Sequence, residues 1–124
     1  MVPYAAYKVI HLLGMFLLFT VLGGIALHAL NGGTRQSNVG RKLAGALHGI
    51  ALFVILLGGF GMLARLGMVR GGLPGWIWAK LVIWVLLGAF GTLPYRKPVL
   101  AKPFLIVLPL LGALAAIFAI YKPI

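Results

Sequence analysis

The chain of 124 residues contains no aspartate, no glutamate and no cysteine. Without acidic side chains, no salt bridge between side chains can form. A carboxylate proton relay is excluded, and so is a serine nucleophile activated by a carboxylate base. Without cysteine, disulfides, thiol catalysis and cysteine-ligated metals are excluded. The 11 lysine and arginine residues must find their counter-charges elsewhere, and we expect anionic membrane lipids to supply them.

The residues that are present are mostly apolar. Hydrophobic residues make up 63% of the chain and the mean hydropathy is +1.14, far above the value for a soluble domain. Four apolar stretches, each about long enough to cross a bilayer, predict helices over residues 4–30, 39–66, 75–93 and 103–121. We therefore predict an all-α fold, in which residues 1–124 form a single transmembrane domain. Its architecture would be an integral membrane four-helix bundle with antiparallel up-down topology. No cleaved signal peptide is expected, because the first apolar stretch is too long and lacks a positive region before it.

The segments between these stretches are polar and carry most of the cations. Asn31, Gly32 and Gly33 follow the first stretch, and two glycines at that position predict a left-handed end to the helix. We expect the loops at one end of the bundle, with their flanking turns, to face the cytoplasm; they hold Arg35, Arg41, Lys42, Arg96, Lys97 and Lys102. The other end would hold Lys8, Arg65, Arg70, Lys80, Lys122 and the C-terminal carboxylate of Ile124. Because the cations are spread over both ends without a soluble basic face, nucleic acid is not expected as a partner.

Small residues predict where the helices approach one another. In the second stretch, Gly45 and Gly49 flank His48 at a spacing typical of close membrane helix pairs, and Gly58 follows. Gly24 belongs to a matching stripe in the first stretch, and Gly112 begins another small-residue pair in the last. The pattern predicts a tight antiparallel pair of the first two helices.

Four cationic or imidazole side chains are predicted to lie on the same side of the membrane at similar depths. Counting residues from the helix ends places His11 and Lys80 roughly 8–10 Å below the same surface, with Lys8 one turn shallower. Arg65, at the end of the antiparallel second helix, reaches the same side. We interpret Lys8, His11, Arg65 and Lys80 as a cationic shelf that suits an anionic headgroup, haem propionates or a polar quinone head. The alternative is that the two lysines reach lipid phosphates independently.

The three histidines are the only candidate metal ligands. His48 is deep in its helix, where an ionisable residue is either functional or hydrogen-bonded across a helix pair, and both readings stay open. His28 is expected near the opposite surface, packed against the second helix. Since His11, His28 and His48 lie at different depths, a bis-histidine haem within one chain is disfavoured, as is a single copper site. Ligation of a haem by one histidine, or by histidines of two copies, remains open.

The residues Tyr7-Lys8-Val9-Ile10-His11-Leu12-Leu13-Gly14 resemble the opening helix of a group of small bacterial membrane proteins. The group includes the HemJ-type protoporphyrinogen oxidase, the CopD copper-resistance membrane domain and SirB-like proteins. The resemblance implies a bacterial inner membrane protein with a similar fold, in which His11 and Lys80 correspond to functional positions and haem or porphyrin is the cofactor. The chain lacks the arginine of the HemJ type in the second half of its first helix, and it has no acidic residue.

These features predict a small membrane protein that is not an enzyme. We expect an accessory or binding subunit, which binds lipid or another anionic cofactor at the cationic shelf and assembles with copies of itself or with partner subunits. The alternative is a haem- or porphyrin-associated redox protein that uses His11 and Lys80. Transport of copper or a small solute is a weaker alternative, because a bundle this small would need to oligomerise to form a path across the membrane.

Overall fold

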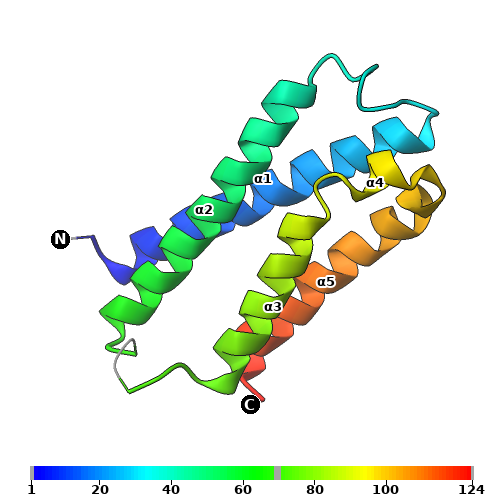
Figure 1. Ribbon diagram of the computed structural model, residues 1–124. Coiled ribbons are helices and arrows are strands. Elements are labelled where there is room, and N and C mark those ends of the chain that lie inside the picture. Colours follow the sequence, from blue (N-terminus) through cyan, green and yellow to red (C-terminus); the bar gives the residue numbers. More distant parts are fainter. Residues whose placement is uncertain (1, 69–70, 124) are drawn as a thin grey trace.

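The computed structural model describes residues 2–68 and 71–123, and this part of the chain is helical with no strand. Arg70 and the Ile124 carboxylate lie outside the described residues. Both are predicted at the end of the bundle that holds Lys8. The elements in order are α1 (Tyr4–Leu30), α2 (Arg41–Arg65), α3 (Gly75–Ala89), α4 (Leu93–Arg96), η1 (Pro98–Leu100) and α5 (Ala101–Tyr121) (Figure 1). The prediction of an all-α fold is confirmed.

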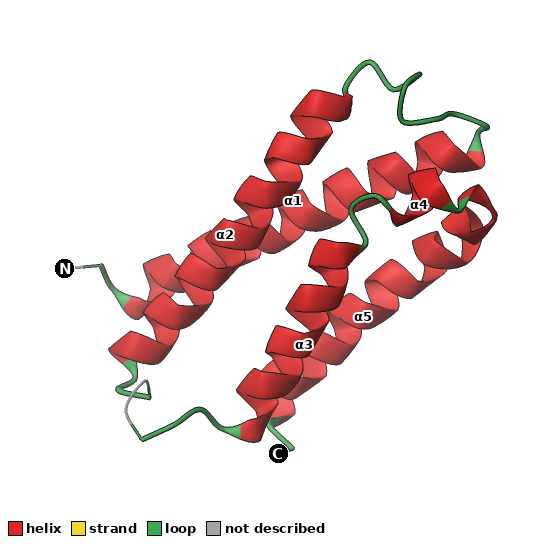
Figure 2. Cartoon of the chain, viewed as in Figure 1, coloured by secondary structure: helices red, strands yellow, loops and turns green. Residues whose placement is uncertain are grey.

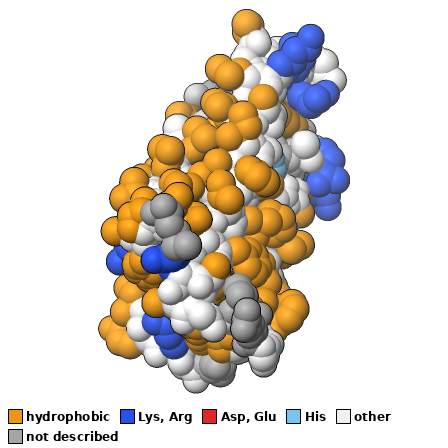
Figure 3. Space-filling model, turned by 90° about the vertical axis from the view of Figure 1, so that its left-hand side faces the viewer, with side chains coloured by type: hydrophobic (Ala, Val, Ile, Leu, Met, Phe, Trp, Pro, Cys, Tyr) orange, Lys and Arg blue, Asp and Glu red, His pale blue; other side chains and the backbone are white. Residues whose placement is uncertain are grey.

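Three segments are long and apolar enough to cross a membrane: α1, α2 and the segment Pro98–Tyr121, which contains α5. The fourth apolar helix, α3, has only 15 residues, which span roughly 22 Å against a hydrocarbon core of about 30 Å. Large apolar side chains lie on the outside; Leu13, Phe16 and Phe53 are 61%, 68% and 65% exposed. Figure 3 shows a face covered mostly by such side chains, with lysine and arginine toward its two ends. This surface is consistent with an integral membrane protein.

A glycine with positive φ follows each of the first two helices. At the end of α1, Gly32 has φ +85° and its N–H donates to the Ala29 carbonyl, while the Gly33 N–H donates to the His28 carbonyl. The same arrangement follows α2, where Gly67 has φ +72°. These paired bonds satisfy carbonyls that the helix end would leave without a donor. The predicted left-handed end after the first helix is confirmed.

The third helix ends four residues earlier than predicted, at Ala89 instead of residue 93. The Leu87 carbonyl would accept the Gly91 N–H in a continuing helix, but that N–H reaches the Gly88 carbonyl at 3.5 Å instead. The freed carbonyl accepts a hydrogen bond from His48. The short α4 then begins at Leu93, and Pro94 lies in its first turn, where a proline fits because no N–H donor is needed there.

The four longer helices alternate in direction, with α1 and α3 running one way and α2 and α5 the other (Figure 1). The most extensive packing is between α1 and α2, while α5 contacts both α1 and α3, and α2 and α3 touch only slightly. A buried cluster fills the middle of the molecule; its members are Leu18, Leu22, Ala26, Ala51, Ile83, Leu87, Phe104, Leu108 and Ala115. Loops join the helices at the two ends (Figure 2).

Candidate functional site

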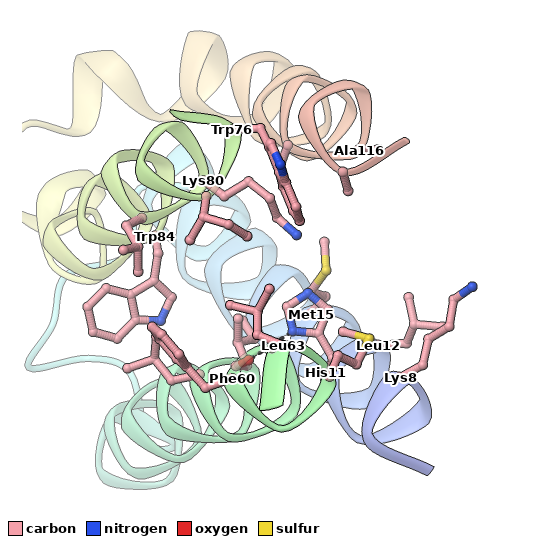
Figure 4. Close-up of a pocket in the computed structure, with 18 of the residues that line it drawn as sticks. Lys8, His11, Leu12, Met15, Phe60, Leu63, Trp76, Lys80, Trp84 and Ala116 are labelled. Atoms are coloured by element: carbon pink, nitrogen blue, oxygen red, sulfur yellow. Dashed lines mark hydrogen bonds between the residues drawn. The ribbon is translucent and has the colours of Figure 1, made fainter. Parts of the chain in front are cut away.

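A cavity of about 400 Å³ lies between the α1–α2 pair and the α3–α5 pair. It is at the end of the molecule where α1 and α3 begin and α2 and α5 end, because Tyr4, Leu66, Trp76 and Lys122 all line it. Most of its wall is apolar. The polar or aromatic side chains that line it are Tyr4, Lys8, His11, Phe60, Trp76, Lys80, Trp84 and Lys122. Figure 4 shows most of them around the cavity.

His11 contributes one face of its ring to this cavity. The residue is 8% exposed, and its Nδ1 lies 2.8 Å from the carbonyl oxygen of Ile55 on α2. A carbonyl can only accept, so Nδ1 carries the proton and donates it. No buried side-chain nitrogen or oxygen of the described residues is sealed off without a partner, so the second nitrogen, Nε2, is open to the cavity.

Glycines on α2 and α1 make this position of His11 possible. A Cβ on Gly58 would lie 2.5 Å from the His11 backbone nitrogen and 2.7 Å from its Cα, so only glycine allows the two backbones to come this close. One turn away, a Cβ on Gly14 would lie 2.9 Å from the Ile55 nitrogen. The contact brings the His11 ring within reach of a carbonyl of the neighbouring helix.

Lys80 enters the cavity from α3, on the side opposite His11. Figure 4 shows its ammonium pointing into the cavity toward the imidazole. Lys122 lines the same cavity. The Lys122 ammonium sits 5.1 Å from the centre of the Trp76 ring, an arrangement in which the aromatic face attracts the cation. Two ammonium groups and an imidazole therefore share one cavity, and the sequence offers no acidic side chain to balance them.

Two side chains hold α3 beside α2 although these helices touch only slightly. The Trp84 indole N–H donates to the Leu52 carbonyl at 3.0 Å, and His48 Nε2 donates to the Leu87 carbonyl at 3.2 Å. A Cβ on Gly91 would lie 2.6 Å from the His48 ring, so the end of α3 is shaped around this imidazole. His48 thus takes the role of a hydrogen-bond donor between helices, and Trp84 forms both a wall of the cavity and a link across it.

The four residues of the predicted cationic shelf are only partly brought together. His11 and Lys80 face one another across the cavity, but Lys8 lines it with its stem while its ammonium points away (Figure 4). Arg65 is exposed and does not line the cavity, although it makes an interaction of its own. The direction of a flexible side chain at the rim of a helix cannot be obtained from residue counting.

The three histidines do not come together at one place in the described structure. Among the described residues no group of three metal-ligating side chains exists, because His11, His48 and His28 are each bonded to a different backbone carbonyl. His28 lies near the opposite end, where its Nε2 is 2.8 Å from the Thr34 carbonyl and its ring meets the edge of Tyr95. The expectation that it packs against the second helix is wrong, because the loop after α1 folds back over it. A three-histidine copper site within the described chain is therefore not formed.

The predicted helix-packing glycines divide into two groups. Gly58 is buried against α1, and a Cβ on Gly112 would lie 3.2 Å from the Phe19 ring, so both are contact positions. Gly24, Gly45 and Gly49 are exposed, and a Cβ on any of them would meet nothing within 4 Å. Their prediction as contacts within the chain is wrong, because α1 and α2 touch through a different face of each helix.

Several residues of the site were not singled out from the sequence. Gly14 carries the α1–α2 contact, but a single glycine in an apolar helix gives no pairing signal. Trp84 has no polar pattern around it that would predict its bond to α2. Lys122 could have been included, because helix counting places it at the same end as Lys80.

Comparison of the chain with protein-family models, with curated proteins and with solved structures found no match. The site must therefore be understood from its own chemistry. An imidazole with one open nitrogen, two ammonium groups and two indole rings surround an otherwise apolar space. Such a space can bind a molecule that has a polar, anionic end and an apolar body.

Proposed function

We propose that this chain is an integral membrane protein whose cavity binds the anionic head of a lipid or a similar amphiphile. Its role is binding within a membrane assembly, and it catalyses no reaction. The observation that carries the proposal is the Lys80 ammonium, which points into an apolar cavity in a chain without acidic side chains. In this proposal the four apolar helices form an up-down bundle in the inner membrane of a bacterium.

Electrostatics favours an external anion at this position. A charged group in an apolar setting is stable only when it is paired or hydrogen-bonded. Here a second cation, Lys122, lines the same cavity as Lys80, which increases the need for a negative charge. Since the chain has no aspartate or glutamate, no side chain of its own can supply the anion, and the proposed source is a ligand or a partner.

The walls of the cavity favour an amphiphile over a small ion. Met15, Leu63, Leu81 and Ala115 are among the apolar residues that line it. A volume of about 400 Å³ is at the lower end of the range for ligand sites, enough for a headgroup and the first part of an acyl chain. The remainder of the chain would extend into the surrounding bilayer.

Lipid retention by matched variants tests the proposal. Native mass spectrometry of the purified protein, given equal amounts of phosphatidylglycerol and phosphatidylcholine, is expected to show preferential retention of the anionic lipid. Lys80→Gln should weaken that retention about tenfold or more, because a charge-assisted hydrogen bond contributes about 1.5–3 kcal/mol. Lys102→Gln, at an exposed lysine of the opposite end, is the control and should change it little. Equal retention by all three proteins would contradict the proposal.

A haem or porphyrin is the second candidate ligand, and the geometry of His11 favours it. A ligating histidine usually donates its other ring N–H to a carbonyl, as Nδ1 does here to Ile55. His11 could hold the iron of a haem through Nε2, and Lys80 could pair with a propionate. The other two imidazoles are bonded elsewhere, so a second ligand would have to come from another chain. An absorption spectrum of the purified protein tests this, since a preparation without a Soret band contradicts haem binding.

Assembly with copies of itself or with partner subunits is the third part of the proposal. Gly24, Gly45 and Gly49 are exposed with open space above them, so another membrane helix can approach their backbones. Chemical crosslinking in native membranes, followed by mass determination, tests this part. A chain that remains monomeric and free of crosslinked partners would refute it.

A further inference from the structure

The two polar groups that face one another in the cavity have different hydrogen-bonding capacities. The Lys80 ammonium has three N–H donors and no acceptor. The neutral His11 ring, with its Nδ1 proton given to the Ile55 carbonyl, offers a lone pair at Nε2 and therefore acts toward the cavity as an acceptor. A ligand that pairs with both groups brings an acceptor for Lys80 and a donor for Nε2 of His11.

We infer that the ligand is an amphiphile whose head carries both an anionic group and a hydroxyl. This inference rests on the proposed function and specifies the ligand class for the same cavity. The anion contacts Lys80, the hydroxyl donates to Nε2 of His11, and the tail lies along the apolar wall. A phosphate ester that bears a free hydroxyl, such as the head of phosphatidylglycerol, has this pattern.

The fixed orientation of the imidazole makes the selection specific. Exchanging the two ring nitrogens would lose the 2.8 Å bond to Ile55, and the backbone of α1 at His11 lies in close contact with Gly58 of α2. The acceptor at Nε2 is thus held in place by the backbone of α2. An anionic head without a hydroxyl would pair with Lys80 but would offer no donor to this acceptor.

A pair of lipids of equal charge, one with free hydroxyls on its head and one with none, gives the sharpest test. Phosphatidylglycerol and phosphatidylethanol carry the same charge and can be made with the same brominated acyl chains, which quench nearby tryptophans. The protein has three tryptophans, of which Trp76 and Trp84 line the cavity while Trp78 is 58% exposed. In a Trp78→Phe background, quenching therefore reports occupancy of the cavity.

The expected result is that phosphatidylglycerol binds about 3- to 10-fold more tightly than phosphatidylethanol, the effect of one hydrogen bond. His11→Phe should reduce this ratio to about one, and Lys80→Gln should weaken both lipids together. Water-soluble glycerol phosphate, which has the same head without tails, should compete only weakly, because the apolar wall has nothing to bind.

The outcomes test the hydroxyl inference and the proposed function separately. Equal binding of the two lipids by the unmutated His11 protein, with both weakened by Lys80→Gln, overturns the hydroxyl inference and leaves the proposed function standing. Absence of quenching by either lipid overturns both. Strong competition by glycerol phosphate would assign the site to a soluble phosphate ester and refute the amphiphile. Because the lipid comparison needs no change at His11, it remains decisive even where His11→Phe fails to fold.

Discussion

Replacing Gly58 by alanine should force α1 and α2 apart. The added methyl group would lie 2.5 Å and 2.7 Å from backbone atoms of His11, which cannot move without moving the helix, whereas ordinary contact begins at 3.4 Å. The two helices would have to separate by roughly 1 Å. At that separation the contacts between them lose a quarter to a half of their dispersion energy. The Gly58→Ala change also strains the bond between His11 and the Ile55 carbonyl.

The magnitude follows from two opposing effects. Overpacking a tight contact costs about 1–3 kcal/mol, and a clash with backbone belongs at the upper end of that range. Alanine recovers up to about 1 kcal/mol of helix propensity relative to glycine. The net expectation for Gly58→Ala is a loss of about 2 kcal/mol in the free energy of unfolding.

Unfolding in mixed micelles of a mild detergent and dodecyl sulfate, followed by tryptophan fluorescence, measures this loss. Gly45→Ala on the same helix is the matched control, because its methyl group would meet nothing within 4 Å. It should leave the stability unchanged or raise it slightly. A Gly58→Ala protein as stable as the parent, or a Gly45→Ala protein that loses as much, would refute the assigned α1–α2 contact.

Three further changes test the hydrogen bonds that connect the elements. His48→Ala leaves the carbonyl at the end of α3 without its donor and should cost about 1–3 kcal/mol in the same unfolding assay; a neutral effect contradicts the role assigned to this imidazole. Trp84→Phe removes the indole N–H together with part of the ring, and the lost hydrogen bond to the Leu52 carbonyl alone should cost about 0.5–1.5 kcal/mol; unchanged stability would contradict this link between α3 and α2. Tyr95→Phe removes the acceptor of the 2.6 Å bond from Asn38 and should speed amide exchange in the loop after α1, with unchanged exchange as the contrary result.

Much of the fold could be predicted from the sequence because it follows from apolar length and glycine. The first helix has the predicted bounds, and the second and last differ from prediction by two residues or fewer at each end. The end of α1 at Gly32 depends on a positive φ that glycine adopts without strain. The early end of α3 was not predicted; the carbonyl that it frees accepts a hydrogen bond from His48, 39 residues away in sequence, and no local pattern indicates that bond.

The candidate site was predictable in part, and the limit is the rotation of each helix about its axis. Residue counting gives depth along a helix, and it correctly groups His11 with Lys80. Rotation decides which face is buried, and here the face of Gly14 and Gly58 forms the contact in place of the face of Gly24 and Gly45. Both faces of α2 carry small residues, so the sequence pattern alone does not choose between them.

The most direct measurement is a crystal structure of the protein grown from a lipidic mesophase that contains phosphatidylglycerol. The account predicts electron density for an anionic head in the cavity, with its phosphate within hydrogen-bonding distance of the Lys80 ammonium and a hydroxyl near Nε2 of His11. A cavity that holds no lipid head, with the phosphates instead on Lys8 and Arg65 at the rim, would contradict it.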